Sequence, residues 1–406
     1  MPTTTAQSTP PTRSPDVASD AGGTLRAVVL PSLFLMVAMF NLTLIVAGLK
    51  ELMIDDLGGT TADASLFFSI EMLAYILFAP LWGLLSDRWR LRRSFVAFGF
   101  FASGLCYLAY TSIDDLHSLL LLRFVQGAFS VMGWSTLMAM VSDHPDEERR
   151  GRNMGIMGAG LIFGISIGAP IGGYISRELG TRAPLTVAGV LFLLLAVGAF
   201  LIPKSVATSR PLGLRDMGRA LARCPRLLLP YLFQFADRYT VGFFIVLFPQ
   251  YLATLGVSDP AVRGRYLALF LLPFAFLQYF TGRLSEKIGP MRPLLVGSAI
   301  YGVVLCWVGV SSLYELWWVM AALGVLASVM FPPAMALTAQ LSEPEIRGSA
   351  MGGFNLAGSL GFAIGPLVGN AVFERYGFAV AFISAGAVEL AVVLAAGVAL
   401  LSWRRR

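Results

Sequence analysis

Several residue types on which enzymes and cofactor proteins depend are scarce in this chain of 406 residues. It contains only 2 histidines and 3 cysteines, and their spacing gives neither a metal site nor a disulfide framework. The sequence has no phosphate-binding loop of the Gly-x-x-x-x-Gly-Lys type and no Ser–His or His–Glu pattern near its apolar segments. It therefore predicts no enzyme, no metal or other cofactor, and no direct use of ATP.

Charge is scarce as well, and apolar residues take its place. Charged residues make up 13% of the chain and hydrophobic residues 56%, whereas soluble domains have about 25% and about 45–50%. A run of about 20 apolar residues crosses a bilayer, and roughly twelve such runs are present. We therefore expect an all-α membrane protein with spans at residues 27–49, 64–85, 93–112, 116–141, 153–176, 184–202, 228–252, 264–284, 293–311, 314–340, 348–373 and 377–402.

The positions of the basic residues predict the topology. Of the 30 Lys and Arg residues, 22 fall on the side that holds both termini and 6 on the other, while Arg123 and Arg238 lie inside spans. The positive-inside rule places both termini in the cytoplasm of a cell whose inner (plasma) membrane holds the protein. The net charge of +6 thus reflects membrane topology and not a nucleic-acid partner. Residues 1–25, rich in Thr, Ser and Pro, predict a disordered cytoplasmic tail and not a signal peptide.

The chain contains an internal repeat. "LLPYLFQFADRYTVGFF" aligns with "VLPSLFLMVAMFNLTLI" when Pro230 is set on Pro31, and the same offset sets "GRLSEKIGPMR" on "GLLSDRWRLRR". We expect two parallel six-helix halves, 26–202 and 227–406, joined by a cytoplasmic linker at 203–226. Such a duplication is typical of transporters whose halves rock around a site between them.

Three motifs resemble those of the major facilitator superfamily. "GLLSDRWRLRR" is similar to its loop between helices 2 and 3, "LLLLRFVQGAFS" to its helix 4 motif, and "GLIFGISIGAPIGG" to the helix 5 motif of proton-coupled exporters. The resemblance covers residues 27–402. It implies the twelve-helix major facilitator fold, with helices 1, 4, 7 and 10 lining a central cavity. The first loop carries Arg90 where the family has glycine, whereas the second copy keeps Gly289.

The loop after the second span holds a candidate gate. By the resemblance, Asp87 contacts the start of helix 11 when the cytoplasmic side is closed, and Arg88 and the repeat residue Glu286 belong to the same gate. An acidic residue contributes nothing to positive-inside topology, which favours this interpretation of Asp87. The neighbouring arginines at positions 90, 92 and 93 are interpreted as topological anchors.

Charges inside spans are costly and indicate function. Glu71 and Arg123 each lie about 10 Å below the predicted outer surface, at 1.5 Å per residue. They predict a buried pair that is either a static tie or a protonation switch. Glu389, in a helix that the fold makes peripheral, is interpreted as structurally paired.

A second charged position lies in the middle of helix 7. Gln234, Asp237 and Arg238 share one helix face, and a polar face at this depth must point at protein or at a wet cavity. Asp237 is the better candidate for a proton carrier, with Glu71 and Arg123 as further coupling residues. An ion pair without a ligand role remains the alternative.

Polar and aromatic side chains on the inner helices define the predicted substrate cavity, which includes Asn41, Gln126, Gln234, Arg238, Trp134 and Tyr239. Such a lining fits an amphipathic, partly apolar ligand, although aromatic residues often pack in cores or against lipid. Recurring glycines predict close helix contacts, which we expect at the interface between the halves: Gly164, Gly168, Gly172, Gly361 and Gly365. Pro332 and Pro333 predict a bend in helix 10 near its cytoplasmic end.

These features predict a monomeric secondary active transporter that works by alternating access. We expect proton-coupled export of an amphipathic organic compound, as the resemblance to twelve-helix drug:proton antiporters implies. Its partners would be a small-molecule substrate, protons and the lipid bilayer. One alternative is a proton-coupled transporter of a specific metabolite or lipid-like solute, in either direction. Another is a non-transporting membrane sensor or scaffold, which the lack of a sizeable soluble domain disfavours.

Overall fold

The computed structural model describes residues 25–142, 150–203, 213–343 and 345–404. These residues form helices and no β-strand. The predicted tail lies outside the described residues except for its last position.

The first half of the chain forms six long helices. A π-helical turn, Leu25–Val29, leads into α2, and short helical turns Val46–Gly48, Glu51–Asp56 and Ala199–Leu201 follow α2 and α7. The long helices are α2 (Leu30–Leu44), α3 (Thr61–Trp89), α4 (Arg92–Tyr110), α5 (Leu116–Ser142), α6 (Arg150–Leu179) and α7 (Ala183–Gly198).

The second half repeats this pattern after a short helix in the linker. That helix is α8 (Leu214–Arg223), and a 3-10 turn at Pro225–Leu227 follows it. The remaining helices are α9 (Leu228–Thr254), α10 (Pro260–Ile288), α11 (Met291–Val308), α12 (Leu313–Ser328), α13 (Phe331–Leu341) and α14 (Arg347–Arg404). Gly377, with φ 79°, divides α14 into two helices, 347–376 and 378–404.

The helices match the predicted spans, except that the tenth span is interrupted. Nine helical segments of the described residues are long and apolar enough to cross a membrane. Helices α4 and α9 are not among these nine, because polar residues lower their mean hydropathy. Helix α14 is counted once although it contains two helices. The tenth predicted span is broken between α12 and α13, and Pro332 and Pro333 lie in the first turn of α13. The break therefore lies nearer the middle of that span than its end.

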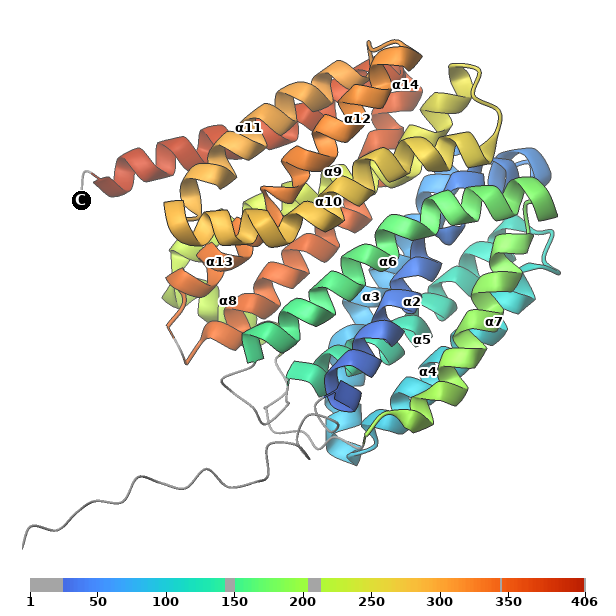
Figure 1. Ribbon diagram of the computed structural model, residues 1–406, viewed down its shortest axis with the longest axis horizontal. Coiled ribbons are helices and arrows are strands. Elements are labelled where there is room, and N and C mark those ends of the chain that lie inside the picture. The colour runs from blue at the N-terminus through green and yellow to red at the C-terminus, as the bar shows by residue number, and fades with distance from the viewer. Residues whose placement is uncertain (1–24, 143–149, 204–212, 344, 405–406) are drawn as a thin grey trace, which may run out of the picture.

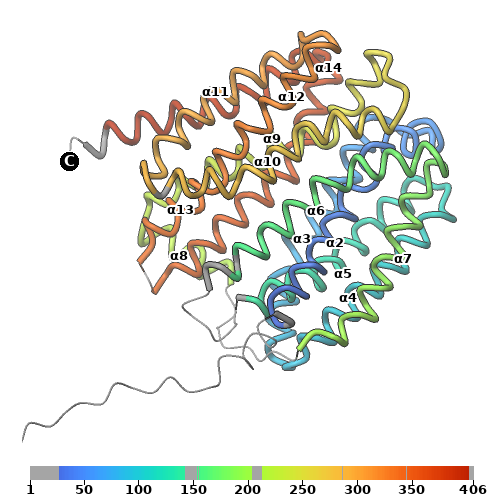
Figure 2. Tube along the Cα trace, in the orientation of Figure 1, coloured from blue at the N-terminus to red at the C-terminus, as the bar shows by residue number. Residues whose placement is uncertain are grey.

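The two halves lie side by side, the first drawn blue to green and the second yellow to red (Figure 1). They contact each other along α6 with α10 and along α3 with α14. We call the end of the bundle that holds α8 the linker end, and the opposite end, where α3 begins, the far end. In Figure 2 the traces of α6 and α10 approach at the far end and diverge toward the linker end.

Contacts along α6 locate this divergence. Near its middle, the Ser166 hydroxyl donates a hydrogen bond to the Leu271 carbonyl of α10 at 2.8 Å. Toward the far end, a Cβ added to Gly264 of α10 would lie 2.8 Å from a backbone oxygen of α6. At the linker end of α6, by contrast, Cβ atoms on Gly155 and Gly158 would meet open space. The described conformation is therefore closed at the far end and open at the linker end.

The recurring glycines pack within each half, which corrects their predicted place between the halves. Added Cβ atoms on Gly164, Gly168 and Gly172 of α6 would lie 1.6–2.4 Å from backbone oxygens of α2. Gly361 and Gly365 of α14 meet backbone oxygens of α9 at 2.3 and 2.2 Å. Their expected use in close packing is correct, but the partner is the first helix of the same half. Glycine spacing shows that a helix face is flat, not which neighbour covers it.

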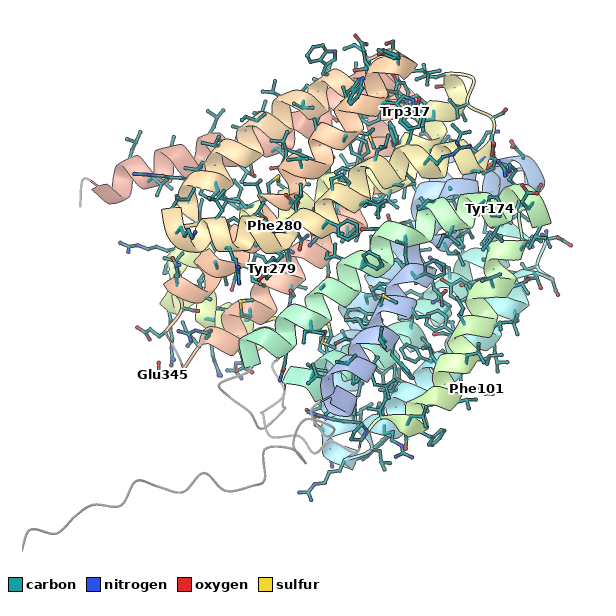
Figure 3. The ribbon with its side chains drawn as sticks, in the orientation of Figure 1. Phe101, Tyr174, Tyr279, Phe280, Trp317 and Glu345 are labelled. Atoms are coloured by element: carbon teal, nitrogen blue, oxygen red, sulfur yellow. The ribbon has the colours of Figure 1, made fainter. Side chains whose placement is uncertain are left out.

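Exposed aromatic side chains mark the far end of the bundle. Tyr174 and Trp317 lie near this end (Figure 3), and Tyr314 and Trp318 at the start of α12 are exposed. Tyrosine and tryptophan concentrate where membrane meets water, because their rings are apolar and their tips are polar. These residues therefore fit one edge of the membrane-spanning region.

Candidate functional site

Arg123 of α5 and Glu71 of α3 form a fully buried ion pair in the first half. The guanidinium Nη2 lies 2.5 Å from Glu71 Oε2, and the side chains are 0% and 1% exposed. The other guanidinium nitrogens donate to the Tyr107 hydroxyl at 3.1 Å, Gln126 Oε1 at 2.9 Å and the Phe67 carbonyl at 3.3 Å. Every nitrogen of this guanidinium therefore has at least one acceptor.

The carboxylate of Glu71 is also well satisfied. Tyr75, one helical turn further along α3, donates its hydroxyl hydrogen to Glu71 Oε1 at 2.8 Å. Gly127 lets α5 approach this part of α3, since an added Cβ would lie 3.2 Å from the Glu71 Cα. The matching depth inferred from the sequence thus brings Glu71 and Arg123 together, within the half and not at its surface.

The second charged cluster lies on α9 and is much less satisfied. Arg238 Nη1 lies 3.7 Å from Asp237 Oδ2, which is an ion pair but longer than a hydrogen bond. Neither oxygen of Asp237 accepts a hydrogen bond from the residues that the structure describes, although only 2% of the residue is exposed. A buried carboxylate without donors is costly, which sets this position apart from the satisfied pair in the first half.

Three aromatic rings surround the Arg238 guanidinium. Its central carbon lies 4.6 Å from the ring centre of Phe331, 5.6 Å from that of Phe362 and 5.9 Å from that of Phe274. These rings come from α13, α14 and α10, and the break before α13 places Phe331 here. Aromatic faces attract cations, so the arrangement can hold a positive charge away from water.

The two charged clusters are connected across the interface between the halves. Phe362, which lies against Arg238, contacts Phe68 of α3 with ring centres 6.2 Å apart. The adjacent Phe67 lies 4.3 Å from the Arg123 guanidinium. The Phe67–Phe68 stretch of α3 therefore connects the charged cluster of the first half to that of the second.

Several predicted cavity residues lie inside their own half, which corrects their assignment. The Asn41 side chain donates to the Ala188 carbonyl of α7 at 3.3 Å and is fully buried. Gln126 accepts a hydrogen bond from Arg123 at its Oε1 atom. Tyr239 lies where α9 meets α14, beside Gly361 and Gly365.

The remaining cavity residues differ in their surroundings. Trp134 is half-buried and packs edge-on against Tyr75, with ring centres 5.3 Å apart. The Gln234 side chain lies against Gly358, between α9 and α14. Arg238 is the predicted cavity residue that the ring contacts connect to the other half.

The candidate gate residue Asp87 is paired locally. Arg92 donates from Nε to Asp87 Oδ1 at 2.8 Å, and its Nη2 lies at the same distance. Arg92 is 2% exposed, so it is more than the topological anchor that the sequence predicted. Arg88 is exposed, and the side chain of Glu286 lies outside the described residues.

The far end contains ion pairs between the halves that the sequence analysis did not identify. The buried Arg263 of α10 pairs with Glu51, which follows α2. Arg177 of α6 lies 3.4 Å from Asp259, at the start of α10. Each pair joins a helix residue to a residue in a turn or loop far away in sequence, and no periodic pattern relates such residues. They contribute to closing this end.

Glu389 was expected to have an ionic partner, and the structure shows none among the described residues. The residue is 0% exposed, and neither carboxyl oxygen has a hydrogen-bond partner there. A buried charge of this kind is unfavourable without compensation.

Comparison with known proteins identifies the family. The sequence profile of the Major Facilitator Superfamily matches residues 32–262 and 227–406. The multi-drug resistance efflux pump PmrA of Streptococcus pneumoniae is 24% identical over 330 residues, covering 79% of this chain and 81% of PmrA. The multidrug resistance protein MdtG of Klebsiella pneumoniae is 25% identical over 370 residues, covering 87% and 88%.

Among solved structures, that of the nucleoside transporter NupG resembles this fold with a TM-score of 0.74. It covers 91% of this chain and 98% of NupG at 13% sequence identity, which supports the fold alone. The profile matches span nearly all of the described helices. The chain therefore belongs to the Major Facilitator Superfamily of multi-pass membrane transporters.

Proposed function

We propose that this transporter exports amphipathic organic compounds across the inner membrane in exchange for protons, acting as a monomer. The observation that carries the proposal is the Asp237–Arg238 cluster. It combines a buried carboxylate without hydrogen-bond donors and a cation among three aromatic rings, next to the interface between the halves. The names of PmrA and MdtG describe drug efflux, which supports this direction of transport.

Alternating access follows from the two ends of the bundle. The far end is held by the ion pairs of Arg263 and Arg177, whereas α6 has open space beside it at the linker end. With the linker end in the cytoplasm, as the positive-inside rule indicates, the described conformation faces inward. A substrate would then enter from the cytoplasm and leave after the far end opens.

The ring cluster around Arg238 supports an amphipathic substrate. Aromatic faces favour large apolar bodies, and the few charged groups nearby would orient a ligand with one polar end. We assign Glu71 and Arg123 a static role that holds α3 against α5, because their charges are already fully satisfied. The region around Asp237 and Arg238 then remains as the proposed place of proton coupling.

Transport into sealed proteoliposomes tests the proposal. A pH gradient is imposed, and lipophilic cations, neutral drugs and lysolipids are screened for accumulation and for substrate-induced pH change. We expect at least one amphipathic compound to accumulate only with the gradient. Accumulation that is independent of pH but follows sodium, or movement only of one small polar metabolite, would overturn the proposed coupling or substrate class.

Sidedness has its own test. We expect Arg219→Cys in α8 to react with an impermeant thiol reagent only after cells are permeabilised. Val310→Cys, at the far end and 66% exposed, should react in intact cells. The reverse labelling pattern would invert the proposed direction of opening.

A further inference from the structure

The buried Glu389 lies in the second part of α14, the helix 378–404, which packs against α9 through Phe382 and Phe243. Helix 378–404 packs closely on α11, since a Cβ added to Gly386 would lie 2.4 Å from the Gly302 carbonyl oxygen. Glu389 follows Gly386 by one helical turn, and Tyr301 precedes Gly302. This crossing therefore brings the Glu389 carboxyl to the same buried level as the Tyr301 ring, which is 0% exposed.

Tyr301 connects this level to Asp237. Its hydroxyl donates to Thr240 Oγ1 at 3.3 Å, and the Thr240 hydroxyl in turn donates to the backbone carbonyl oxygen of Asp237 at 2.9 Å. The Tyr301 side chain therefore reaches from α11 to the turn of α9 that carries Asp237, while the next residue, Gly302, packs on the turn of α14 that carries Glu389. The titratable and charged groups facing one another are thus Glu389 from α14, Tyr301 from α11, and Asp237 with Arg238 from α9.

Charge balance in this region requires a proton. Two carboxylates face one guanidinium, so the cluster would carry a net charge of −1 in a setting that excludes water. Neutrality is reached when one carboxyl is protonated, and buried groups adopt their neutral forms when no partner compensates them. Because Asp237 has Arg238 at 3.7 Å and Glu389 lacks a described partner, the proton belongs on Glu389 in this conformation.

We propose that Glu389 and Asp237 form a single one-proton site with Tyr301 between them, and that this proton is the one exchanged during transport. The proposal rests on the proposed function. On release, the O–H bond of the Glu389 carboxyl breaks, its electron pair stays on oxygen, and the proton leaves to water once the site is hydrated. The rings around Arg238 come from α10, α13 and the first part of α14 and not from helix 378–404, so we expect a substrate held by them not to touch Glu389.

Infrared spectroscopy of the full chain in liposomes tests the proton directly, without any substrate. The wild type should show the C=O stretching band of a protonated, buried carboxyl group that disappears as pH is raised. Glu389→Gln should lose that band, and Tyr301→Phe should shift it. The matched control is Glu374→Gln on the same α14, where the exposed Glu374 accepts a hydrogen bond from Asn370. An unchanged band in Glu389→Gln overturns the assignment.

Transport measurements test the use of that proton. One coupled proton supports about tenfold accumulation per pH unit. Glu389→Gln, which keeps the shape of a neutral glutamic acid, should abolish this accumulation and leave the substrate at equal concentrations on both sides of the membrane. Exchange without a gradient should keep the wild-type rate and apparent affinity, and Glu374→Gln should behave as the wild type in every assay.

The outcomes separate the two proposals. Loss of the band with full gradient-driven accumulation makes Glu389 a structural acid and overturns its coupling role. If the wild type accumulates no compound although Glu389→Gln still loses the pH-sensitive band, the proton site is supported and the proposed function fails. A wild-type band that responds to sodium and not to pH overturns the proton as the ligand.

Discussion

The two halves treat buried charge differently, although they descend from one repeated pattern. In the first half, Arg123 and Glu71 share a 2.5 Å contact and a full set of hydrogen bonds. In the second, Asp237 and Arg238 lie 3.7 Å apart, and the Asp237 oxygens have no donors among the described residues. A satisfied network resists change, whereas a half-satisfied one responds to a proton or ligand. This difference supports our proposal that the first half holds its buried charges in place and that the second couples transport to a proton.

The repeat sharpens this contrast. Gly127 meets Glu71 between α5 and α3, and its counterpart Gly324 meets Phe270 between α12 and α10. Four residues before these two glycines stand Arg123 and Met320, and Phe270 and Met320 are both 0% exposed. The second half thus builds this helix contact from apolar side chains. An ion pair is not required for the packing itself, as buried pairs elsewhere can be replaced by apolar residues.

The largest effect should come from unpairing the first cluster. Arg123→Met alone leaves Glu71 buried without its cation and should destabilise the fold by about 3–5 kcal/mol. Adding Glu71→Phe, which copies the second half, should recover most of this loss. Thermal unfolding of the purified protein, followed by tryptophan fluorescence, measures both variants. If the double variant is as unstable as the single one, the halves are not interchangeable here and the pair has a further role.

The second effect concerns transport and not stability. Asp237→Asn removes a charge that accepts no hydrogen bond from the described residues. Its ion-pair partner Arg238 keeps the three aromatic rings around it, so folded protein should remain near the wild-type level. Gradient-driven transport should be abolished, while exchange without a gradient persists because asparagine keeps the shape. Transport is measured per folded molecule, with and without a pH gradient. Normal gradient-driven transport would remove Asp237 from the coupling and return Glu71 to consideration.

Equivalent glycines should differ between the halves. A Cβ on Gly172 would lie 1.6 Å from the Leu44 carbonyl oxygen, whereas one on Gly369 would meet the Phe243 ring at 2.3 Å. Backbone cannot yield but a ring can turn, so Gly172→Ala should cost about 1–3 kcal/mol or more and Gly369→Ala less. Melting temperatures of the two variants make the comparison. Equal losses would show that α9 is as rigidly held as α2.

A smaller effect is expected at the loops that follow α3 and α10. Arg90 has φ 55° and Gly289 has φ 82°, so both positions use a left-handed backbone that glycine adopts without strain. Arg90→Gly should therefore stabilise the first half by about 1 kcal/mol, and Gly289→Arg should destabilise the second. A stability loss in Arg90→Gly would mean that the arginine side chain contributes more than its backbone costs.

The smallest effect lies at the exposed starts of α5 and α12. Asp115 accepts a hydrogen bond from the Ser118 backbone N–H at 2.8 Å, which lowers the pKa of its carboxyl group, whereas the corresponding cap of α12 is the Ser312 hydroxyl. Because the pKa of Asp115 is lower in the folded protein than its unfolded value of about 3.9, the ionised cap stabilises the fold at pH above that value. This stabilisation is lost as the pH falls through the folded pKa. Asp115→Asn should flatten this part of the stability–pH curve, and an unchanged curve would show that the cap contributes nothing.

Hydropathy and repeat alignment predicted the helices and placed Glu71 opposite Arg123, because depth along a helix follows directly from residue count. They did not predict which faces meet. The glycines of α6 pack on α2, and Asn41 faces α7, since a sequence period gives a face but not its neighbour. Arg92 beside Asp87 and Arg263 beside Glu51 depend on how loops fold. Glu389 was misjudged because its depth in the half depends on the crossing of helix 378–404 with α11.

The contact between α6 and α10 has a mechanical consequence. From Ser166, near the inner limit of this contact, to the start of α6 the helix is a rigid arm of roughly 24 Å at 1.5 Å per residue. A tilt of about 15° around that point would move its tip by roughly 6 Å, on the order of one helical turn. Because Gly164, Gly168 and Gly172 of α6 pack against the backbone of α2, α2 would have to move together with α6. In the proposed alternating access, the half would therefore tilt as one rigid body, and the side chains near Ser166 would slide only slightly while the linker end opens and closes.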